Sequence, residues 1–314
     1  MYPSTIQKDY YENQMNALRQ MVHIVHSIKY SETYSRGLRV ERYRNLFRGN
    51  IPKKIVNYAK DKLDREKLKN KVSPIPKRKK NVEEPNYFSK YRIAVYTCVF
   101  GQYDKIHQPI SLPDNVDYYI ITDICNKDFG VWKKVDISKF SNQIKDFSNV
   151  EKNRWFKMHA HLVFGKDYRY SLYIDGNVLP VTDFTEFANR IGEPGIAMFW
   201  HRYNNCVYQE AMYNIYDIKK TNENEIYKQI EYLKEMGMPS DYGMTTCNVI
   251  ARDHSNLVCV KLMEDWWQEF MLNCRRDQLS FPYVAWKNGV SMMDIATLGN
   301  DVWYTDTLLV MDHV

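Results

Sequence analysis

Five short runs of apolar residues follow one another between residues 91 and 252, and each is typical of a buried β-strand. They span residues 91–100, 117–123, 170–175, 195–200 and 244–252. Helical patterns separate several of them, and a further helix is predicted over residues 257–274, where large apolar side chains fall on one face. Strands that alternate with helices favour a mostly parallel α/β sheet. We predict one such domain over residues 86–314.

The segment over residues 154–182 combines a predicted helix with the third of these strands. On a helix, Arg154, Lys157 and His161 fall within about 60° of one another, and apolar residues occupy the opposite side. The strand that follows ends on Asp175, so an acid at the carboxyl end of a strand stands beside a basic helix face. This combination predicts a binding site for a nucleoside diphosphate.

Polar side chains stand at the carboxyl ends of three predicted strands: Thr97 with the GQYD turn at residues 101–104, Asp123, and the pair Asp175 and Asn177. Ligands of open α/β sheets bind at this edge, so we expect these groups to lie near one another. A single acid at a strand end is more often a turn former or a helix cap. The coincidence of three such ends with the basic helix favours a site.

The triplet Asp175-Gly176-Asn177 is a candidate metal site. Two oxygen ligands that flank a glycine suit a hard divalent cation such as Mg²⁺ or Mn²⁺. Such a cation would offset charge on a leaving diphosphate. The amide of Asn177 is a weaker ligand than a carboxylate, so the sequence leaves metal use open.

Histidines occur at three points near these elements. His159 and His161 do not predict a zinc site, because positions two apart on a helix point about 200° apart. His161 is instead a candidate donor to phosphate, or else a surface residue. After the fourth strand, His201, Arg202 and Glu210 could line a sugar pocket, or His201 could be an ordinary loop histidine.

The polar cluster at residues 274–278 has two interpretations. Asp277 could simply cap the short helix that follows. In a pocket, Asp277 and Gln278 could instead orient a sugar hydroxyl or act as a base, while Arg276 contacts the phosphate or the sugar.

The net charge of +6 is unevenly distributed. Residues 1–90 contain 21 Lys and Arg against 9 Asp and Glu, whereas the remainder contains 23 against 29. We predict a basic extension over residues 1–85, with helices near 5–30 and 52–71 and an exposed linker after them. The extension could pack on the main domain, mediate a homo-oligomer or contact anionic lipid headgroups. Nothing between its charges resembles a nucleic-acid-reading element, so we expect no nucleic-acid partner.

The cellular compartment can be predicted from apolar runs and cysteines. No apolar run approaches the roughly 18 residues of a membrane span, and the N-terminus lacks the pattern of a signal peptide. The six cysteines are scattered without a CxxC pair, which is typical of reduced thiols. We expect a cytoplasmic protein, with possible peripheral contact at the inner face of the cell membrane.

Six blocks of sequence, taken together, resemble a single family: IAVYTCVFGQYD, YYIITD, NRWFKMHAHLVF, YSLYIDGNV, HRYNNCVYQEA and RRDQLSFPYVAWK. It is the glycosyltransferase-like domain family once known as a domain of unknown function, found in plant mucilage and pollen proteins and in bacterial polysaccharide loci. The resemblance spans residues 91–290. It implies a GT-A fold, which is a Rossmann-like α/β/α sandwich, and transfer of a sugar from a nucleotide-sugar donor such as a UDP-sugar. The acceptor would be a polysaccharide or a lipid-linked glycan in surface or capsule synthesis.

The basic helix followed by an acid-ended strand is also similar to family 8 glycosyltransferases, in which the helix arginine and an Asp-x-Asp triplet contact donor and metal. By position, the resemblance implies donor contacts for Arg154, Lys157 and Asp123, metal contacts for Asp175, Asn177 and His313, and sugar contacts for Asp277 and Gln278. Asn177 stands where the triplet has its second acid. Plant members carry a membrane anchor that this sequence lacks, so we expect a bacterial-type enzyme.

Other functions are compatible with the same residues. A glycoside hydrolase would use two carboxylic acids around a sugar, with Asp277 and Glu210 as the pair. A non-catalytic nucleotide- or glycan-binding module would keep the fold without turnover. Nucleic-acid binding through residues 1–90 would depend steeply on salt. The sequence sets neither the donor sugar nor the stereochemistry of transfer.

Overall fold

The computed structural model describes residues 17–25, 27–28, 31–34, 36–37, 40, 91–101, 103–125, 127–181, 184–202, 204–215, 221–305 and 307–311. Most of the predicted extension over residues 1–85 therefore lies outside the described residues, including the predicted helix at 52–71 and the linker, and so does His313. The described residues between 17 and 40 are mainly helical, in agreement with the helix predicted near 5–30.

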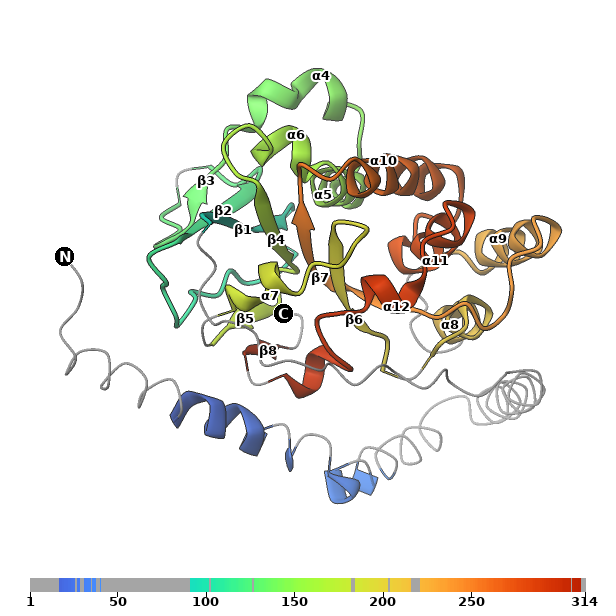
Figure 1. Cartoon of the computed structure of the whole chain (residues 1–314), viewed down its shortest axis with the longest axis horizontal. Helices are drawn as coiled ribbons and strands as arrows, with labels where there is room; N and C mark the ends of the chain where they lie inside the picture. The colour runs from blue at the N-terminus through green and yellow to red at the C-terminus, as the bar shows by residue number, and fades with distance from the viewer. Residues whose placement is uncertain are drawn as a thin grey trace, which may run out of the picture.

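A six-stranded sheet forms the centre of the domain, in the order β3-β2-β1-β4-β7-β6 (Figure 1). Its strands are β1 Ile93–Val99, β2 Val116–Thr122, β3 Lys133–Lys134, β4 Tyr170–Ile174, β6 Ile196–Trp200 and β7 Thr245–Asp253. All neighbouring pairs are parallel except those of β7, which runs antiparallel to β4 and β6. The five predicted strands and the mostly parallel sheet are confirmed. Strand direction was not predictable, because an apolar run carries no sign of it. A separate antiparallel pair joins β5 Val178–Pro180 to β8 Leu308–Val310.

Helices cover both faces of this sheet (Figure 1). They are η1 Ile137–Phe140, α4 Ser141–Ile144, α5 Asn149–Met158, α6 Ala160–Phe164, α7 Glu186–Asn189, α8 Val207–Tyr213, α9 Glu223–Glu235, α10 Leu257–Leu272, α11 Asp277–Lys287, α12 Met292–Ile295 and η3 Val302–Tyr304. Alternate residues of β1 enter opposite cores, because side chains alternate along a strand. Tyr96 belongs to a cluster with Trp266 of α10, and Val95 to another with Phe187 of α7. A sheet buried on both faces by helices confirms the predicted α/β/α sandwich.

Helix α5 has clear signals at both ends. It begins with a capping box, in which the Ser148 hydroxyl accepts from the backbone N–H of Glu151 and the Glu151 carboxylate accepts from that of Ser148. It ends before His159, whose backbone leaves the helical region. The carbonyl of Lys157 is then free to accept from the Tyr96 hydroxyl at 3.2 Å and from Nη2 of Arg252 at 2.6 Å. These buried donors fix the turn of helix that carries Lys157.

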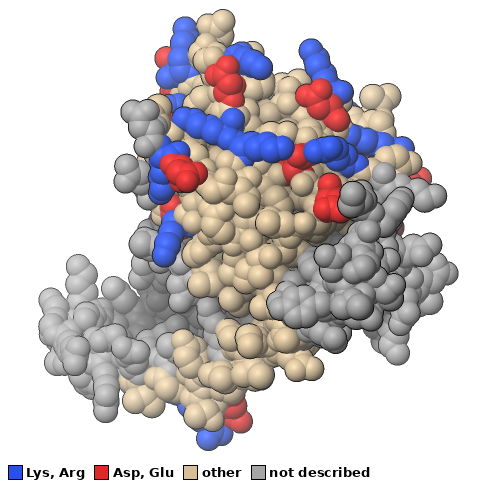
Figure 2. Space-filling model, turned by 90° about the vertical axis from the view of Figure 1, so that its left-hand side faces the viewer, with Lys and Arg blue, Asp and Glu red and all other residues tan. Residues whose placement is uncertain are grey.

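The face of the molecule that carries β3 shows Lys and Arg side chains interleaved with Asp and Glu (Figure 2). Charges of both signs in alternation are typical of a solvated surface. Among the helices of the described residues, none is both long enough and apolar enough to cross a membrane.

Candidate active site

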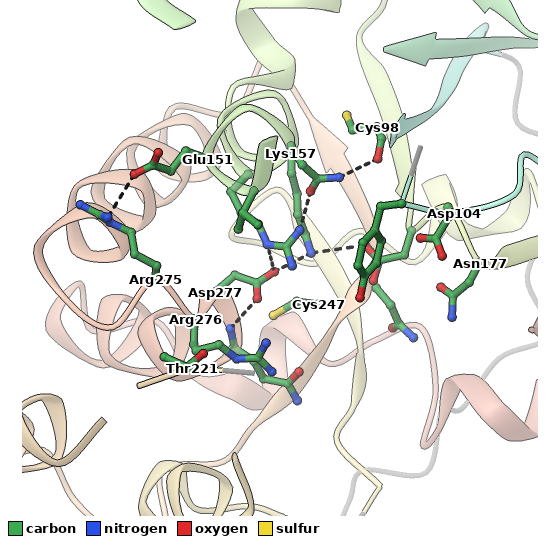
Figure 3. Close-up of a pocket in the computed structure, with 18 of the residues that line it drawn as sticks. Cys98, Asp104, Glu151, Lys157, Asn177, Thr221, Cys247, Arg275, Arg276 and Asp277 are labelled. Carbon is green, nitrogen blue, oxygen red and sulfur yellow. Dashed lines mark hydrogen bonds and ion pairs between the residues drawn. The ribbon is translucent and has the colours of Figure 1, made fainter. Parts of the chain in front are cut away.

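A cavity of about 1160 Å³ opens at the edge of the sheet where β1 and β4 end and β7 begins. Its walls come from α5, from the turns after β1 and β4, from the start of β7, and from α8 and the N-terminus of α11. Ligands of open α/β sheets bind outside the carboxyl ends of the parallel strands, so this cavity is where a site is expected. Figure 3 shows the side chains at its centre.

Asp277 holds two cations of α5 in the cavity wall (Figure 3). Its Oδ2 lies 2.9 Å from Nε of Arg154 and 2.7 Å from Nζ of Lys157. Positions three apart on a helix share a face, which is why both cations reach one acid. The side chain of Lys157 is 1% exposed and that of Arg154 is 23% exposed. The two positive charges are thus held away from bulk solvent, beside a space that can receive an anion.

The environment of Asp277 keeps its carboxyl ionised. Burial alone would raise the pKa of Asp277, but the charges of Arg154 and Lys157 and the hydrogen bond from Lys157 outweigh burial and hold the pKa well below its usual range. The other oxygen, Oδ1, accepts from the backbone N–H of Gln278 at 3.1 Å. A carboxylate with such a low pKa is a weak proton acceptor. The geometry therefore suits Asp277 to anchor the cations better than to act as a base.

Lys157 also reaches the acid that follows β4. Its Nζ lies 3.6 Å from Oδ1 of Asp175, and the same oxygen accepts a hydrogen bond of 2.6 Å from the Tyr173 hydroxyl. Lys157 thus stands between Asp175 and Asp277. The structure brings Arg154 and Lys157 of the basic helix face together with the strand-end acid, while their part in donor binding stays a prediction.

The turn after β4 is built to approach the turn after β1. A Cβ atom on Gly176 would stand 3.0 Å from Cγ2 of Val99 and 3.1 Å from Oδ2 of Asp104, so a larger residue would require these side chains to shift, and glycine lets the Asp104 carboxylate lie close to this backbone. Asp104 and Asn177 are seen beside each other at the cavity wall in Figure 3. Sequence analysis noted the GQYD turn but did not single out Asp104.

The side chains around the turn after β4 have the chemistry to bind a divalent cation. Asp104 and Asp175 offer carboxylate oxygens, and Asn177, whose Nδ2 donates to the carbonyl of Met311 at 2.8 Å, offers an amide oxygen. Hard oxygen donors of this kind fit Mg²⁺ or Mn²⁺, with further oxygens supplied by a diphosphate. Across the described part of the chain, no group of three or more His, Cys, Asp or Glu could hold a metal by itself. His313, the remaining predicted ligand, lies outside the described residues.

A second polar cluster lines the cavity where α8 begins. The Glu210 carboxylate, 3% exposed, accepts from Nδ2 of Asn204 at 2.6 Å and from Nδ2 of Asn214 at 3.0 Å, and it lies 3.5 Å from Nε2 of His201. Burial raises the pKa of Glu210, and the hydrogen bonds from the two amides oppose that rise. Burial lowers the pKa of His201 to about 4, so its ring is neutral near pH 7. The two predicted pocket residues therefore meet as a neutral imidazole and a buried carboxyl.

Three predicted site residues do not line the cavity. Thr97 is 3% exposed inside β1, because side chains alternate along the strand and the next residue takes the cavity side. Asp123 accepts from the backbone N–H of Gly101 at 3.2 Å and so fixes the turn after β1. Arg202 forms an ion pair of 3.2 Å with Asp301. The structure gives Asp123 and Arg202 protein partners and buries Thr97 in the sheet, and their contacts with donor or sugar stay predictions.

A fourth predicted site residue, His161, also lies away from the cavity wall. A continuous helix would point it toward the cavity, but the helix breaks at His159 and turns His161 to Glu264 of α10, at 2.8 Å from Oε1. His159 reaches Oε2 of the same carboxylate at 3.5 Å. The break in the helix brings both imidazoles to one carboxylate, which positions two apart on an unbroken helix would not allow. Burial lowers the pKa of His161, opposed by the charge of Glu264.

Sequence analysis missed the start of β7, where Thr246, Cys247 and Asn248 line the cavity. In a parallel strand these first residues would lie at the opposite edge of the sheet. Because β7 runs antiparallel, its start shares an edge with the ends of β1 and β4. The polar letters TTCN at the head of an apolar run were the available signal.

An α/β/α sandwich with a polar cavity at the carboxyl ends of its parallel strands is the architecture of GT-A glycosyltransferases, the class predicted from the sequence. The chain belongs to the TOD1/MUCI70 glycosyltransferase-like domain family, whose model matches residues 79–302. The resemblance noted in the sequence is therefore confirmed, and with it the GT-A fold and the general assignment as a glycosyltransferase. No curated protein matches the sequence.

Solved structures with a similar arrangement include three glycosyltransferases. The apo structure of the bifunctional glycosyltransferase WbbM matches with a TM-score of 0.40 and 9% identity over 70% of this chain and 40% of that one. The galactosyltransferase LgtC, in complex with donor and acceptor sugar analogues, gives 0.37 and 10% over 63% and 72%. Mouse xyloside xylosyltransferase 1 gives 0.37 and 10% over 63% and 82%.

Proposed function

We propose that the protein is a hexosyltransferase that moves a sugar from a UDP-sugar to a hydroxyl group of a glycan acceptor. The acceptor oxygen attacks the anomeric carbon, the bond from that carbon to the diphosphate breaks, and UDP leaves. Catalysis then depends on holding the reactants in line and on stabilising the negative charge that grows on the diphosphate.

The observation that carries this proposal is the position of Lys157. An ammonium group that is 1% exposed between two carboxylates, Asp175 and Asp277, is stabilised by them when the site is empty. A diphosphate in the cavity would add a further anion to Lys157 and Arg154. Buried cations of this kind act strongly on a developing charge because little water screens them.

A divalent cation, when bound at Asp104, Asp175 and Asn177, supplies additional positive charge to the leaving diphosphate. In this proposal the protein's own residues still orient the donor. Arg154 and Lys157 contact its phosphates from α5. Asp277 keeps both cations in place without taking a proton.

We also propose an acceptor class and a cellular location for the enzyme. The cavity of about 1160 Å³ exceeds the space that one ligand of drug size fills, which leaves room for part of a polysaccharide or lipid-linked acceptor. The excess of Lys and Arg in residues 1–90 would favour the anionic inner face of a cell membrane during surface-polysaccharide synthesis.

The direct experiment incubates the protein with a panel of nucleotide sugars, with and without Mn²⁺, and measures release of the nucleoside diphosphate by a coupled assay. We expect release from one donor, accelerated by a glycan acceptor. Tight nucleotide binding without release would instead support a non-catalytic module. Cleavage of a glycan in the absence of any nucleotide would support a hydrolase, although the low pKa of Asp277 makes it a poor acid for that reaction.

A further inference from the structure

Three polar atoms in residues that line the cavity are buried and have no hydrogen-bond partner among the described residues. They are Oγ1 of Thr246, Oδ1 of Asn248 and Nε of Arg276; Nε of Arg154 also has no hydrogen-bond partner, but it is ion-paired with Asp277. Buried polar groups in native proteins are nearly always paired, because leaving them unpaired costs free energy. Unpaired atoms in residues that line one cavity therefore point to a ligand that pairs with them.

The position of these atoms relates them to the diphosphate site. The backbone N–H of Asp175 donates to the carbonyl of Asn248 at 2.9 Å, so Asn248 lies directly across from the strand-end acid. Thr246 is two residues nearer the start of β7 and is 3% exposed. Arg276 immediately precedes Asp277, and its charge acts on the Glu210 carboxyl. The backbone N–H of His201 donates to the carbonyl of Met244 at 2.9 Å, so Thr246 lies along the chain between the residues that pair with Asp175 and with His201.

The chemistry of these atoms defines their ligand. An amide oxygen accepts hydrogen bonds, a guanidinium nitrogen donates them, and a hydroxyl group does both. A sugar ring displays hydroxyl groups that donate and accept in the same way, and in a nucleotide sugar the ring follows directly after the diphosphate. We propose that Thr246, Asn248 and Arg276 form the subsite that recognises the hydroxyl groups of the transferred sugar. This inference rests on the proposed function, since it requires a nucleotide-sugar donor.

Such a subsite sets donor specificity. A site built to hydrogen-bond a hydroxyl rejects an analogue that lacks it, because the protein group is then left buried and unpaired. A donor without the matching hydroxyl should bind no better than its nucleoside diphosphate. The start of β7, and not the Asp175 triplet, then distinguishes one sugar from another.

The test compares UDP with a panel of UDP-hexoses and UDP-pentoses by calorimetry on the full chain. The variants are Thr246→Val and Asn248→Leu, which remove the polar atoms, and Thr246→Ser, which keeps the hydroxyl. Thr245→Val is the matched control, because Thr245 is the neighbouring residue of β7 and does not line the cavity. Thermal melting establishes that each variant is folded.

We expect Thr246→Val and Asn248→Leu each to weaken the preferred UDP-sugar by roughly tenfold, with UDP itself within about twofold of wild type. Thr246→Ser should restore most of the affinity, and Thr245→Val should leave both ligands unchanged. If both variants bind UDP and the UDP-sugar as wild type does, the subsite is wrong while the proposed function stands. If wild type binds no nucleotide at all, the proposed function fails and this inference fails with it.

Discussion

Two carboxylates in this protein have the same kind of partners and different surroundings. Asp117 of β2 lies 2.5 Å from Nε of Arg92 and 2.7 Å from Nζ of Lys133, much as Asp277 meets an arginine and a lysine of α5. In both cases the pKa of the carboxyl is lowered, at Asp117 chiefly by the hydrogen bond from Arg92. The cations differ: Arg92 and Lys133 are 65% and 60% exposed, whereas Lys157 is 1% exposed.

The difference in exposure separates a surface ion pair from a candidate site. Exposed partners keep most of their hydration, so their pairing contributes little and is screened by salt. Placing Lys157 in a nearly solvent-free wall is costly unless its charge is compensated. A buried carboxyl with a lowered pKa beside a cavity, such as Asp277, is typical of functional sites. A carboxylate with two cations is therefore not a functional signal by itself. Whether water hydrates the two cations distinguishes a surface ion pair from a candidate site.

The largest effect is expected from the acid after β4. Asp175→Asn removes a charge beside Lys157 and at the proposed cation site, and should lower turnover on the order of 1000-fold with the fold intact. Steady-state release of UDP measures it. Wild-type turnover in Asp175→Asn would remove Asp175 from the mechanism, whereas Asp117→Asn should retain full turnover.

A matched pair of lysine variants addresses the comparison directly. Lys157→Met should lower kcat/KM by about 100-fold, since one group that stabilises charge in the transition state is lost. Lys133→Met removes the equivalent lysine from the Asp117 site and should leave kcat/KM within about twofold. Equal losses in both variants would mean that the buried position of Lys157 has no special role.

The same comparison extends to stability. Asp277→Asn removes the acid that both cations share and leaves Lys157 with Asp175 alone, and it should reduce the free energy of unfolding by about 3 kcal/mol. Asp117→Asn should cost clearly less, because water can solvate Arg92 and Lys133. Urea denaturation of the three proteins gives both values. A larger loss of unfolding free energy in Asp117→Asn than in Asp277→Asn would contradict the view that the cations around Asp277 depend more on their acid.

The pKa of Asp277 predicts how that difference depends on pH. A carboxyl whose pKa is lower in the folded state contributes stability that is fully present above its unfolded pKa, about 4, and is lost as the pH falls through the folded value. The stability difference between wild type and Asp277→Asn should therefore be constant from pH 5 to 8 and shrink below about pH 4. A difference that fades between pH 6 and 7 would point to another titrating group.

The smallest effect is expected at His161. Its imidazole is paired with Glu264 on α10, outside the cavity, so His161→Gln should leave kcat/KM for UDP release within about twofold of wild type. A tenfold rise in KM for the donor would restore the phosphate-binding role inferred from a continuous helix.

Much of the fold and part of the site could be predicted from the sequence, because both depend on local patterns. Apolar runs located the strands, and the three-residue spacing of Arg154 and Lys157 put them on one face of α5. What could not be predicted depends on longer-range packing. The direction of β7 brought Thr246 to the cavity, and the helix break at His159 turned His161 away. Asp104 lies close to the Asp175 triplet, where Gly176 has no side chain to displace it.

The central claim is that the cations held by Asp277 bind the diphosphate of a nucleotide donor. Calorimetric titration of UDP and UMP against wild type, Lys157→Met and Lys133→Met tests it most directly. The account predicts that wild type and Lys133→Met bind UDP at least tenfold more tightly than UMP, and that Lys157→Met loses this preference. An unchanged preference for UDP in folded Lys157→Met, or equal affinity of wild type for UDP and UMP, would contradict the claim.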